Sequence, residues 1–459
     1  MSASAQTLGT LSRQWVINMN QVMSDSKKKY KSSSQPRAVS ASEIARNLSN
    51  FETWSSHQCC EQVSLSDLPS EFQEDVDNIF GTTKRIPRSW LDKSFDCSPG
   101  FAKFITDASQ TAPELFSADQ SASNELFEDV CVVFSAWKRL VQMRSGKEKW
   151  SEADFVANVY NVFRTPAIRE STFRVQCAIS LPQPQDTFQN AFDVPRVLNT
   201  KTVIPDCAIF IPASRTRPLS HSAKSPYKLL KNHPAVVKAG NAAKRSSFRY
   251  QSTPCAQLPD MPGFEFASSF WEDKKPVHAL LDDAYRQNRM STTAAVRHLH
   301  SLGIHAPVTG LIWADGAVRA HVDWCEKSEG KTVMALQVVM SAPYCGPRGR
   351  SSNDVFHEWK LDRPSDILQV YFLVRNIDGW TTGKFSEYIV RGVNQMVDKL
   401  SSSERTYKPW KRVGDLAPPL KANALKENHN ISVTTVVTSD ASPSPPKPKS
   451  RRRRRRSSN

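Results

Sequence analysis

The sequence has no apolar run of the length that a membrane-spanning helix needs, which is roughly 18 residues. Its opening stretch, MSASAQTLGTLSRQW, contains no apolar segment long enough for a secretory signal. The nine cysteines form no Cys-x-x-Cys pair, and their local cluster with a histidine, His57-Gln58-Cys59-Cys60, is too crowded to suit a zinc site. We therefore expect a nuclear or cytoplasmic protein with reduced thiols, neither secreted nor membrane-bound.

Glycine-rich phosphate-binding loops of the P-loop or dinucleotide type are also missing, which argues against a nucleotide triphosphatase. No repeat of fixed period runs along the chain. What the chain does have is 459 residues, 39% of them hydrophobic, with 11 Trp and 22 Phe. Such a chain is long and apolar enough to fold into a globular protein of two or three domains.

Acidic residues are absent from two segments, 214–259 and 441–459, that carry nine and eight cations respectively. The formal net charge is +16, so the rest of the chain is close to neutral. Clustered cations of this kind predict a nucleic-acid partner, with DNA favoured over RNA, and the run of six arginines also predicts recognition by the nuclear-import machinery. The residues that we expect to contact nucleic acid are Arg215, Arg217, Lys224, Lys228, Lys231, Lys244, Arg245, Arg249, Arg451, Arg452 and Arg453.

Composition divides the chain into segments. Residues 1–42 are expected to be a flexible arm, because they include a polar stretch rich in Ser and Lys. Residues 43–147 show helical patterns separated by breaks, and 148–400 alternate between helical and strand patterns. Within that α/β domain the basic stretch 214–259 has little periodicity and predicts a partly flexible insertion. The Pro-, Ser- and Arg-rich segment 401–459 is expected to be disordered.

Individual elements are predicted from periodicity and from capping residues. Ser123 begins an amphipathic helix, and Ser151, followed by Asp154, is the expected N-cap of another. Asp315-Gly316 is a typical tight turn between two strands. The other predicted elements are strands at 172–180, 202–211, 264–274 and 331–340, and a helix at 277–302, followed by closing elements at 365–375 and 385–400.

Two of the predicted strands carry residues suited to phosphodiester chemistry. Asp206 precedes the apolar run Cys-Ala-Ile-Phe-Ile, and Glu272-Asp273-Lys274 ends the later strand. Residues two apart on a strand share a face, so Glu272 and Lys274 should project together while Asp273 points away. Mg²⁺ prefers hard oxygen ligands, one or two of them carboxylates, so this pattern is consistent with a magnesium site.

The order of helix, strand, strand with Asp206, strand with Glu272-x-Lys274 and helix resembles the PD-(D/E)XK nuclease superfamily, over roughly residues 146–400. The chain is also similar to fungal proteins that carry such a nuclease-like domain. The resemblance implies a restriction-endonuclease-like core, a mixed β-sheet flanked by helices. It further implies that Asp206, Glu272 and the backbone carbonyl of Asp273 hold Mg²⁺ or Mn²⁺, with Glu152 as an added carboxylate. Lys274 would orient or deprotonate the attacking water, or stabilise the charge of the transition state.

Other interpretations stay open at this stage. Asp260 is nearer to Glu272 in sequence than Asp206 is, although Pro259 and Pro262 disfavour a central strand there. Gln287 follows on the next helix and is a weak candidate for the site. The alternation His321-x-Asp323-x-Cys325 is expected to be the polar outer face of a strand, and His298 and His300 are expected on a helix surface. The protein could also be an inactive nucleic-acid-binding or protein-interaction scaffold of the same fold, and the sequence predicts no oligomeric state.

Overall fold

A computed structural model describes residues 38–120, 123–184, 194–242, 247–274, 281–314, 316–327, 337–346, 356–402 and 407–413. All of them belong to one compact unit, Met1–Ala417. The arginine run and most of the segment 401–459 lie outside the described residues, as does nearly all of 1–42. No helix of the described part is long and apolar enough to cross a membrane.

An eight-stranded mixed sheet forms the centre of the described structure, in the order β1-β11-β10-β9-β8-β7-β4, with β12 paired to β10. The pairs β1–β11 and β8–β9 are parallel, and the others are antiparallel. The strands are β1 (Cys60–Gln62), β4 (Thr172–Val175), β7 (Cys207–Phe210), β8 (Ala267–Asp273), β9 (Val308–Ala314), β10 (Ala317–Lys327), β11 (Gln337–Pro343) and β12 (Trp359–Lys360). Two short pairs lie outside this sheet, β2 (Ile86–Pro87) with β3 (Phe116–Ser117) and β5 (Ile179–Ser180) with β6 (Thr202–Val203).

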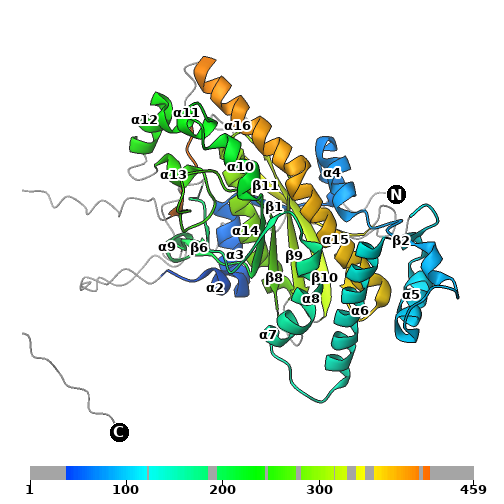
Figure 1. Cartoon of the computed structure of the whole chain (residues 1–459). Coiled ribbons are helices and arrows are strands. Elements are labelled where there is room, and N and C mark those ends of the chain that lie inside the picture. The colour runs from blue at the N-terminus through cyan, green and yellow to red at the C-terminus, as the bar shows by residue number, and fades with distance from the viewer. Residues whose placement is uncertain are drawn as a thin grey trace, which may run out of the picture. The chain divides into compact units, whose positions relative to one another are not determined.

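Helices cover both faces of the sheet, so the predicted architecture of a mixed sheet flanked by helices is confirmed (Figure 1). Neighbouring residues of β9 show the two faces, because Ile312 packs against Tyr285 of α14 (Leu281–Ser301) while Trp313 packs against Phe163 of α8 (Asn161–Ala167). The α14 face also carries α2 (Ala41–Arg46). On the α8 face lie α6 (Asn124–Ser145), whose N-cap is Ser123 as predicted, and α15 (Pro364–Thr382).

The segment 43–147 is helical but also takes part in the sheet. Its helices are α2, α3 (Leu48–His57), α4 (Ser70–Phe80), α5 (Pro99–Thr111) and α6, with short 3₁₀ turns at Leu65–Asp67, Arg88–Leu91 and Pro113–Leu115. Its strand β1 pairs with β11, Cys60 opposite Val339. The predicted N-cap at Ser151 is confirmed by a capping box with Asp154 at the start of α7 (Glu152–Phe155). A π-helical turn, Val156–Tyr160, joins α7 to α8.

The chain order across the middle of the sheet is α8, β4, β7, β8, α14, β9. Strands β4, β7 and β8 form an antiparallel meander, and α14 then connects β8 to its parallel neighbour β9. The predicted hairpin follows, with β9 and β10 joined through Gly316, whose φ of 66° suits a tight turn. The predicted strand at 202–211 is divided into β6 and β7, and Asp206 lies just before β7.

The basic stretch 214–259, predicted to be a partly flexible insertion between two strands, is largely helical in its described part. It contains α10 (Ala213–Thr216), a 3₁₀ turn Arg217–Leu219, α11 (Pro226–Asn232), α12 (Pro234–Ala242) and α13 (Phe248–Gln251). Tyr227, Phe248 and Phe264 pack edge to face, which gives these helices a small aromatic core. Short helices with few apolar positions leave little periodicity in a sequence, so the sequence pattern does not predict these helices.

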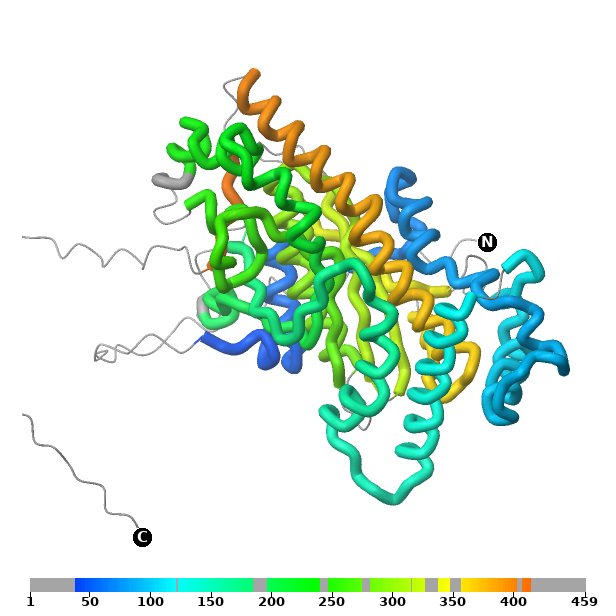
Figure 2. The backbone as a smooth tube through the Cα atoms, in the orientation of Figure 1, coloured from blue at the N-terminus to red at the C-terminus, as the bar shows by residue number. Residues whose placement is uncertain are grey.

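The last described segments close the fold. The closing elements are both helices, α15 and α16 (Lys384–Ser402), and α16 runs past α11 (Figure 2). A short helix, α9 (Val194–Leu198), lies near α3. Residues 407–413, predicted to belong to a disordered tail, pack back onto the domain, because Arg412 is buried and donates to the backbone oxygens of Tyr250, Thr253 and Cys255.

Candidate functional site

The carboxyl end of β8 holds Glu272 and Lys274 together. Both neighbouring strands pair with β8 there, and the N–H of Lys274 donates to the backbone oxygen of Trp313 on β9 at 2.7 Å. Lys274 Nζ binds Glu272 Oε1 in an ion pair whose acid is only 1% exposed. The second oxygen of Glu272, Oε2, is buried and has no hydrogen-bond partner. The predicted pair is therefore assembled, with one carboxylate oxygen left to receive another ligand.

Asp206 lies beside this pair, immediately before the neighbouring strand β7. The register pairs Cys207 with Trp271, which places Asp206 level with the end of β8. Its Oδ2 accepts a hydrogen bond from the N–H of Asp273 at 2.8 Å. The rival acid, Asp260, lies in an exposed bend outside the sheet. Of the two aspartates that the sequence left open, Asp206 is the one that contacts the end of β8.

The pKa values of Glu272, Asp206 and Lys274 are shifted because these charged groups are buried close together. Burial raises the pKa of Glu272 well above its ordinary value, against the lowering effect of Lys274. Burial, and next the Asp273 carboxylate, raise the pKa of Asp206 to about 6. For Lys274 burial lowers the pKa, but the Glu272 carboxylate outweighs it, and the pKa lies above its ordinary value. The acids are thus crowded, and a cation placed among them would relieve their repulsion.

Glu152, the first residue of α7, is partly exposed and close enough for its charge to raise the pKa of Asp206 and that of Lys274. The position follows from the Ser151 capping box, which begins α7 near the end of the sheet. Glu152 thus belongs to the electrostatic surroundings of the site, and in the described part of the chain no hydrogen bond joins its side chain to those of the other acids.

The side chain of Asp273 points away from Glu272, as the alternation predicts, and meets a residue that the sequence analysis missed. Arg164 of α8 donates from Nη1 and Nη2 to both carboxylate oxygens of Asp273, at 2.8 and 3.0 Å. Its guanidinium carbon lies 4.7 Å from the ring centre of Trp313 and 5.4 Å from that of Trp271. Arg164 therefore fixes Asp273, whose N–H in turn holds Asp206. Nothing local in the sequence indicates a partner 109 positions away.

The residues fit a hard divalent cation in part. Among the residues that the structure describes, no group of three or more His, Cys, Asp or Glu side chains is arranged to hold a metal ion. Mg²⁺, however, commonly takes only one or two carboxylates and completes its shell with water and substrate phosphate. The unpartnered Oε2 of Glu272 and the carboxylate of Asp206 are oxygen donors of that kind. We regard these two carboxylates, with Glu152 nearby, as the residues that would hold Mg²⁺ or Mn²⁺.

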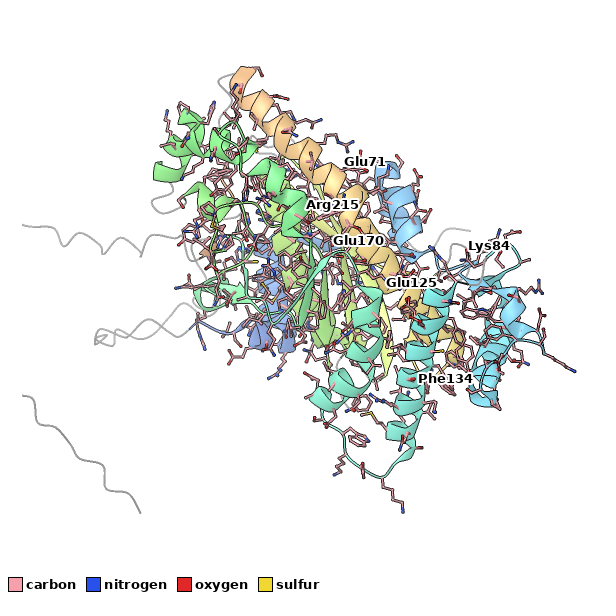
Figure 3. All side chains as sticks on the ribbon, viewed as in Figure 1. Glu71, Lys84, Glu125, Phe134, Glu170 and Arg215 are labelled. Carbon is pink, nitrogen blue, oxygen red and sulfur yellow. The ribbon has the colours of Figure 1, made fainter. Side chains whose placement is uncertain are left out.

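The cations of the predicted nucleic-acid surface have different environments. Arg217, Lys224, Lys228 and Lys231 are exposed. Arg215 is also exposed but pairs with Glu170 at 3.6 Å, and Figure 3 shows both side chains beside the sheet. Arg249 is half-buried and donates to the backbone oxygen of Pro259, so it holds a loop. Lys244, Arg245, Arg451, Arg452 and Arg453 lie outside the described residues.

Three expectations about polar residues are wrong. His298 is buried, not on the helix surface, and His321 and Asp323 are buried, not on a polar outer face. His321 bridges Asp323 at 2.7 Å and Asn288 of α14 at 2.8 Å, so this face of β10 lies under α14. The alternation of polar and apolar residues in β10 was read correctly, but burial of both faces is a property of the tertiary structure. Gln287 is also largely buried, within α14.

The architecture and geometry define a mixed α/β protein with a carboxylate–lysine cluster at the end of its central strand. In comparisons with known proteins, no family model and no curated protein matches the chain.

Proposed function

We propose that this protein is a metal-dependent nuclease that hydrolyses phosphodiester bonds of nucleic acid, with DNA favoured over RNA. The observation that carries the proposal is the meeting of Asp206 with Glu272 and Lys274, which are more than sixty positions apart in sequence, at one end of the sheet. A structural role would be served by the ion pair alone. The additional acid and the unpartnered oxygen of Glu272 favour a place where a ligand binds.

The chain order supports the same proposal. The succession α8, β4, β7, β8, α14, β9, with an antiparallel meander followed by a parallel strand, is similar to what the PD-(D/E)XK superfamily resemblance implies. Asp206 stands at the start of the second strand of this succession, and Glu272-x-Lys274 at the end of the third. The 66-residue separation of the two acids is accommodated by the helices α10 to α13 between those strands.

Each residue of the site has a definite chemical task in this proposal. A divalent metal ion, when bound, supplies Lewis-acid stabilisation of the charge that develops on the phosphate. Asp206 and Glu272 would hold it, and Asp273 would keep Asp206 in place through its N–H. Lys274 places a positive charge beside the scissile phosphate, where it stabilises the transition state and orients the attacking water. Arg164 is a positioning residue, because it acts on the site through Asp273 alone.

The basic helices would form a second contact with the substrate. The exposed cations Arg217, Lys224, Lys228 and Lys231 lie in the segment that connects the end of β7 to the start of β8, at the opposite end of these antiparallel strands from Asp206 and Glu272. A phosphate backbone bound there would be held apart from the end of β8, so only a nucleic acid long enough to span both places would contact the basic helices and the site together. Because each phosphate contact releases counterions, the affinity for nucleic acid should fall steeply with salt.

The test is cleavage of labelled single- and double-stranded DNA and RNA by the full chain with Mg²⁺ or Mn²⁺. We expect Asp206→Asn, Glu272→Gln and Lys274→Met to lose at least about 100-fold in rate, as groups that act on the transition state do. Asp260→Asn is the matched control, since it also removes one acid near a proline but lies outside the site, and it should keep its rate. Loss of activity in Asp260→Asn with retention in Asp206→Asn would overturn the assignment.

A second candidate function is nucleic-acid binding without catalysis. The near-complete burial of Glu272 and its ion pair with Lys274 favour it, because a carboxylate already neutralised by lysine has less need of a metal ion. The same assay separates the two functions. A wild-type chain that binds DNA with salt-sensitive affinity but cuts none of the four substrates would be a binding protein.

A further inference from the structure

A polar cavity of about 700 Å³ lies away from the carboxylate–lysine cluster of Asp206, Glu272 and Lys274. It is formed by the carboxyl end of α14, by the last turns of α16 and by residues 407–411. The remaining wall comes from Pro182–Pro184 and from Gln337, the first residue of β11. Its volume is in the range of pockets that take small molecules, about 300–1,000 Å³.

The described residues that line this cavity include several bases and no acid. Arg297 comes from α14, Lys399 from α16, and Lys408 and Lys411 from the segment that packs back onto the domain. His300 and His305 lie on the same wall. No aspartate or glutamate appears among the described lining residues, in contrast to the cleft around Arg169, which holds as many acids as bases. The described lining of this cavity is therefore electropositive, whereas that of the cleft around Arg169 is mixed in charge.

Arg297 is the most informative of these cations, because it is buried and has no ionic partner among the residues that the structure describes. Its side chain is 5% exposed, and its hydrogen bond goes from Nη2 to the backbone oxygen of Gln58, while Nε has no partner. Burial lowers the pKa of Arg297, and the groups that oppose this effect are the thiols of Cys60, Cys59 and Cys325, not a carboxylate. A buried guanidinium is costly unless an anion compensates it.

Two aromatic residues of the segment that packs back onto the domain also line the cavity. Tyr407 and Trp410 are buried, and the Tyr407 hydroxyl and Trp410 Nε1 have almost no accessible surface. The cations of the lining are therefore the groups that can reach a ligand in the cavity, and the two rings form its apolar part.

We propose that this cavity binds a phosphorylated small molecule, with the Arg297 guanidinium donating to its oxygens and Lys408 and Lys411 neutralising its remaining charge. A phosphate group offers three acceptor oxygens and up to two negative charges, which matches several donors and cations better than a single carboxylate does. The volume of about 700 Å³ is that of a small-molecule site.

The site is separate from the carboxylate–lysine cluster. Glu272 precedes the amino end of α14, whereas Arg297 lies 16 residues beyond Leu281, about 24 Å along the helix axis. Binding in the cavity can therefore be measured whether or not the protein cleaves nucleic acid. Because α14 joins the two places as one rigid element, a ligand in the cavity is also positioned to affect the site through this helix.

The experiment is isothermal titration calorimetry of the full chain with inorganic phosphate, pyrophosphate, AMP and ATP, and with citrate as a phosphate-free polyanion. We expect at least one phosphorylated compound to bind with one-to-one stoichiometry and more tightly than citrate. Arg297→Met should weaken that binding by tenfold or more, the equivalent of about 1.4 kcal/mol. Since Arg297→Met removes a buried side chain, the double variant Lys408→Gln/Lys411→Gln, confined to exposed positions, repeats the test without risk to folding.

Lys147→Gln is the matched control, because Lys147 is an exposed lysine in the loop after α6 and should leave the affinity unchanged. Binding that drops equally in Lys147→Gln and in the double variant would reflect general charge and would overturn the proposal. Equal affinity for citrate and for the phosphorylated compounds would overturn it as well, and so would the absence of heat with all of them.

Discussion

The buried ion pair between Arg164 and Asp273 is the feature whose disruption we predict in most detail. Both side chains are almost fully buried, with exposures of 0% and 3%, and two hydrogen bonds of 2.8 and 3.0 Å join them. Arg164 also donates to Asn161 Oδ1 at 2.9 Å and lies against the rings of Tyr160, Trp271 and Trp313. Replacing it by methionine keeps most of the volume and removes the charge.

The expected loss is set by what stays behind. In Arg164→Met the Asp273 carboxylate is buried without its partner, and breaking a buried pair from one side costs about 3–5 kcal/mol. In Asp273→Asn the guanidinium keeps its ring contacts but loses its counter-charge, so the loss should have a similar size. A double variant, Arg164→Met/Asp273→Leu, replaces both charges by apolar groups, and it should recover most of the loss because no uncompensated charge remains.

The assay is urea-induced unfolding of the full chain, followed by circular dichroism and by tryptophan fluorescence in parallel. Coincident transitions with both probes are needed before the free energies are compared. The reasoning is refuted if each single variant loses less than about 1 kcal/mol, since the pair would then behave like an exposed one. It is also refuted if the free energy of unfolding of the double variant falls by the sum of the losses measured for the two single variants.

Three further predictions concern other sites. Burial lowers the pKa of His298 to about 3, so below pH 6.5 the unfolded chain binds a proton at this histidine and the folded chain does not. The free energy of unfolding should therefore fall by about 1.4 kcal/mol for each pH unit between 6.5 and 3. In His298→Gln this part of the pH dependence of the urea midpoint should disappear. Gly310→Ala would place a Cβ in collision with His321 Nε2 and Asn288 Oδ1, so it should destabilise the protein by about 3 kcal/mol in the same urea assay. Hydrogen bonding from Cys255 lowers the pKa of Cys177 to about 7, so iodoacetamide should alkylate Cys177 with a half-maximal rate near neutral pH.

Each of these has a control in the same chain. For His298, the comparison variant is His233→Gln, which makes the same substitution at a half-buried histidine of the basic segment. For Gly310, the control is Gly379→Ala, where an added Cβ meets nothing within 4 Å. For Cys177, mass spectrometry of the tryptic peptides should show slower reaction at Cys207, whose thiol pKa is raised by burial to about 12. Equal rates at the two cysteines would contradict the prediction.

Local patterns in the sequence predicted much of the fold. Ser123 and Ser151 are the N-caps of their helices because the capping chemistry is complete within three residues. The turn between β9 and β10 is also determined locally, because Gly316 can adopt the positive φ that a tight turn requires. Asp206 and Glu272 could be paired because each occupies the end of a recognisable apolar strand, and antiparallel neighbours bring such ends together.

What the sequence could not supply are contacts whose partners lie far along the chain. Arg164 is one arginine in a helical pattern, and only the packed structure shows it to be the counter-charge of Asp273. His321 and Asp323 alternate with apolar residues as an exposed face would, and it is α14 that buries them. Arg412 lies in a stretch with the composition of a linker, yet three backbone oxygens and a serine hydroxyl hold it inside the domain.

The pairing of β1 with β11 has a consequence for how this protein comes to be folded. Cys60 leaves the ribosome about 280 residues before Val339, the residue opposite it in the sheet. Strand pairing across so long a separation requires a large loop to close, which slows the step that completes the sheet. Until then α2 has no α14 to cover, and its buried Ile44 faces water. Synthesis of the first third of the chain therefore yields a segment that needs protection from aggregation until β11 has been made.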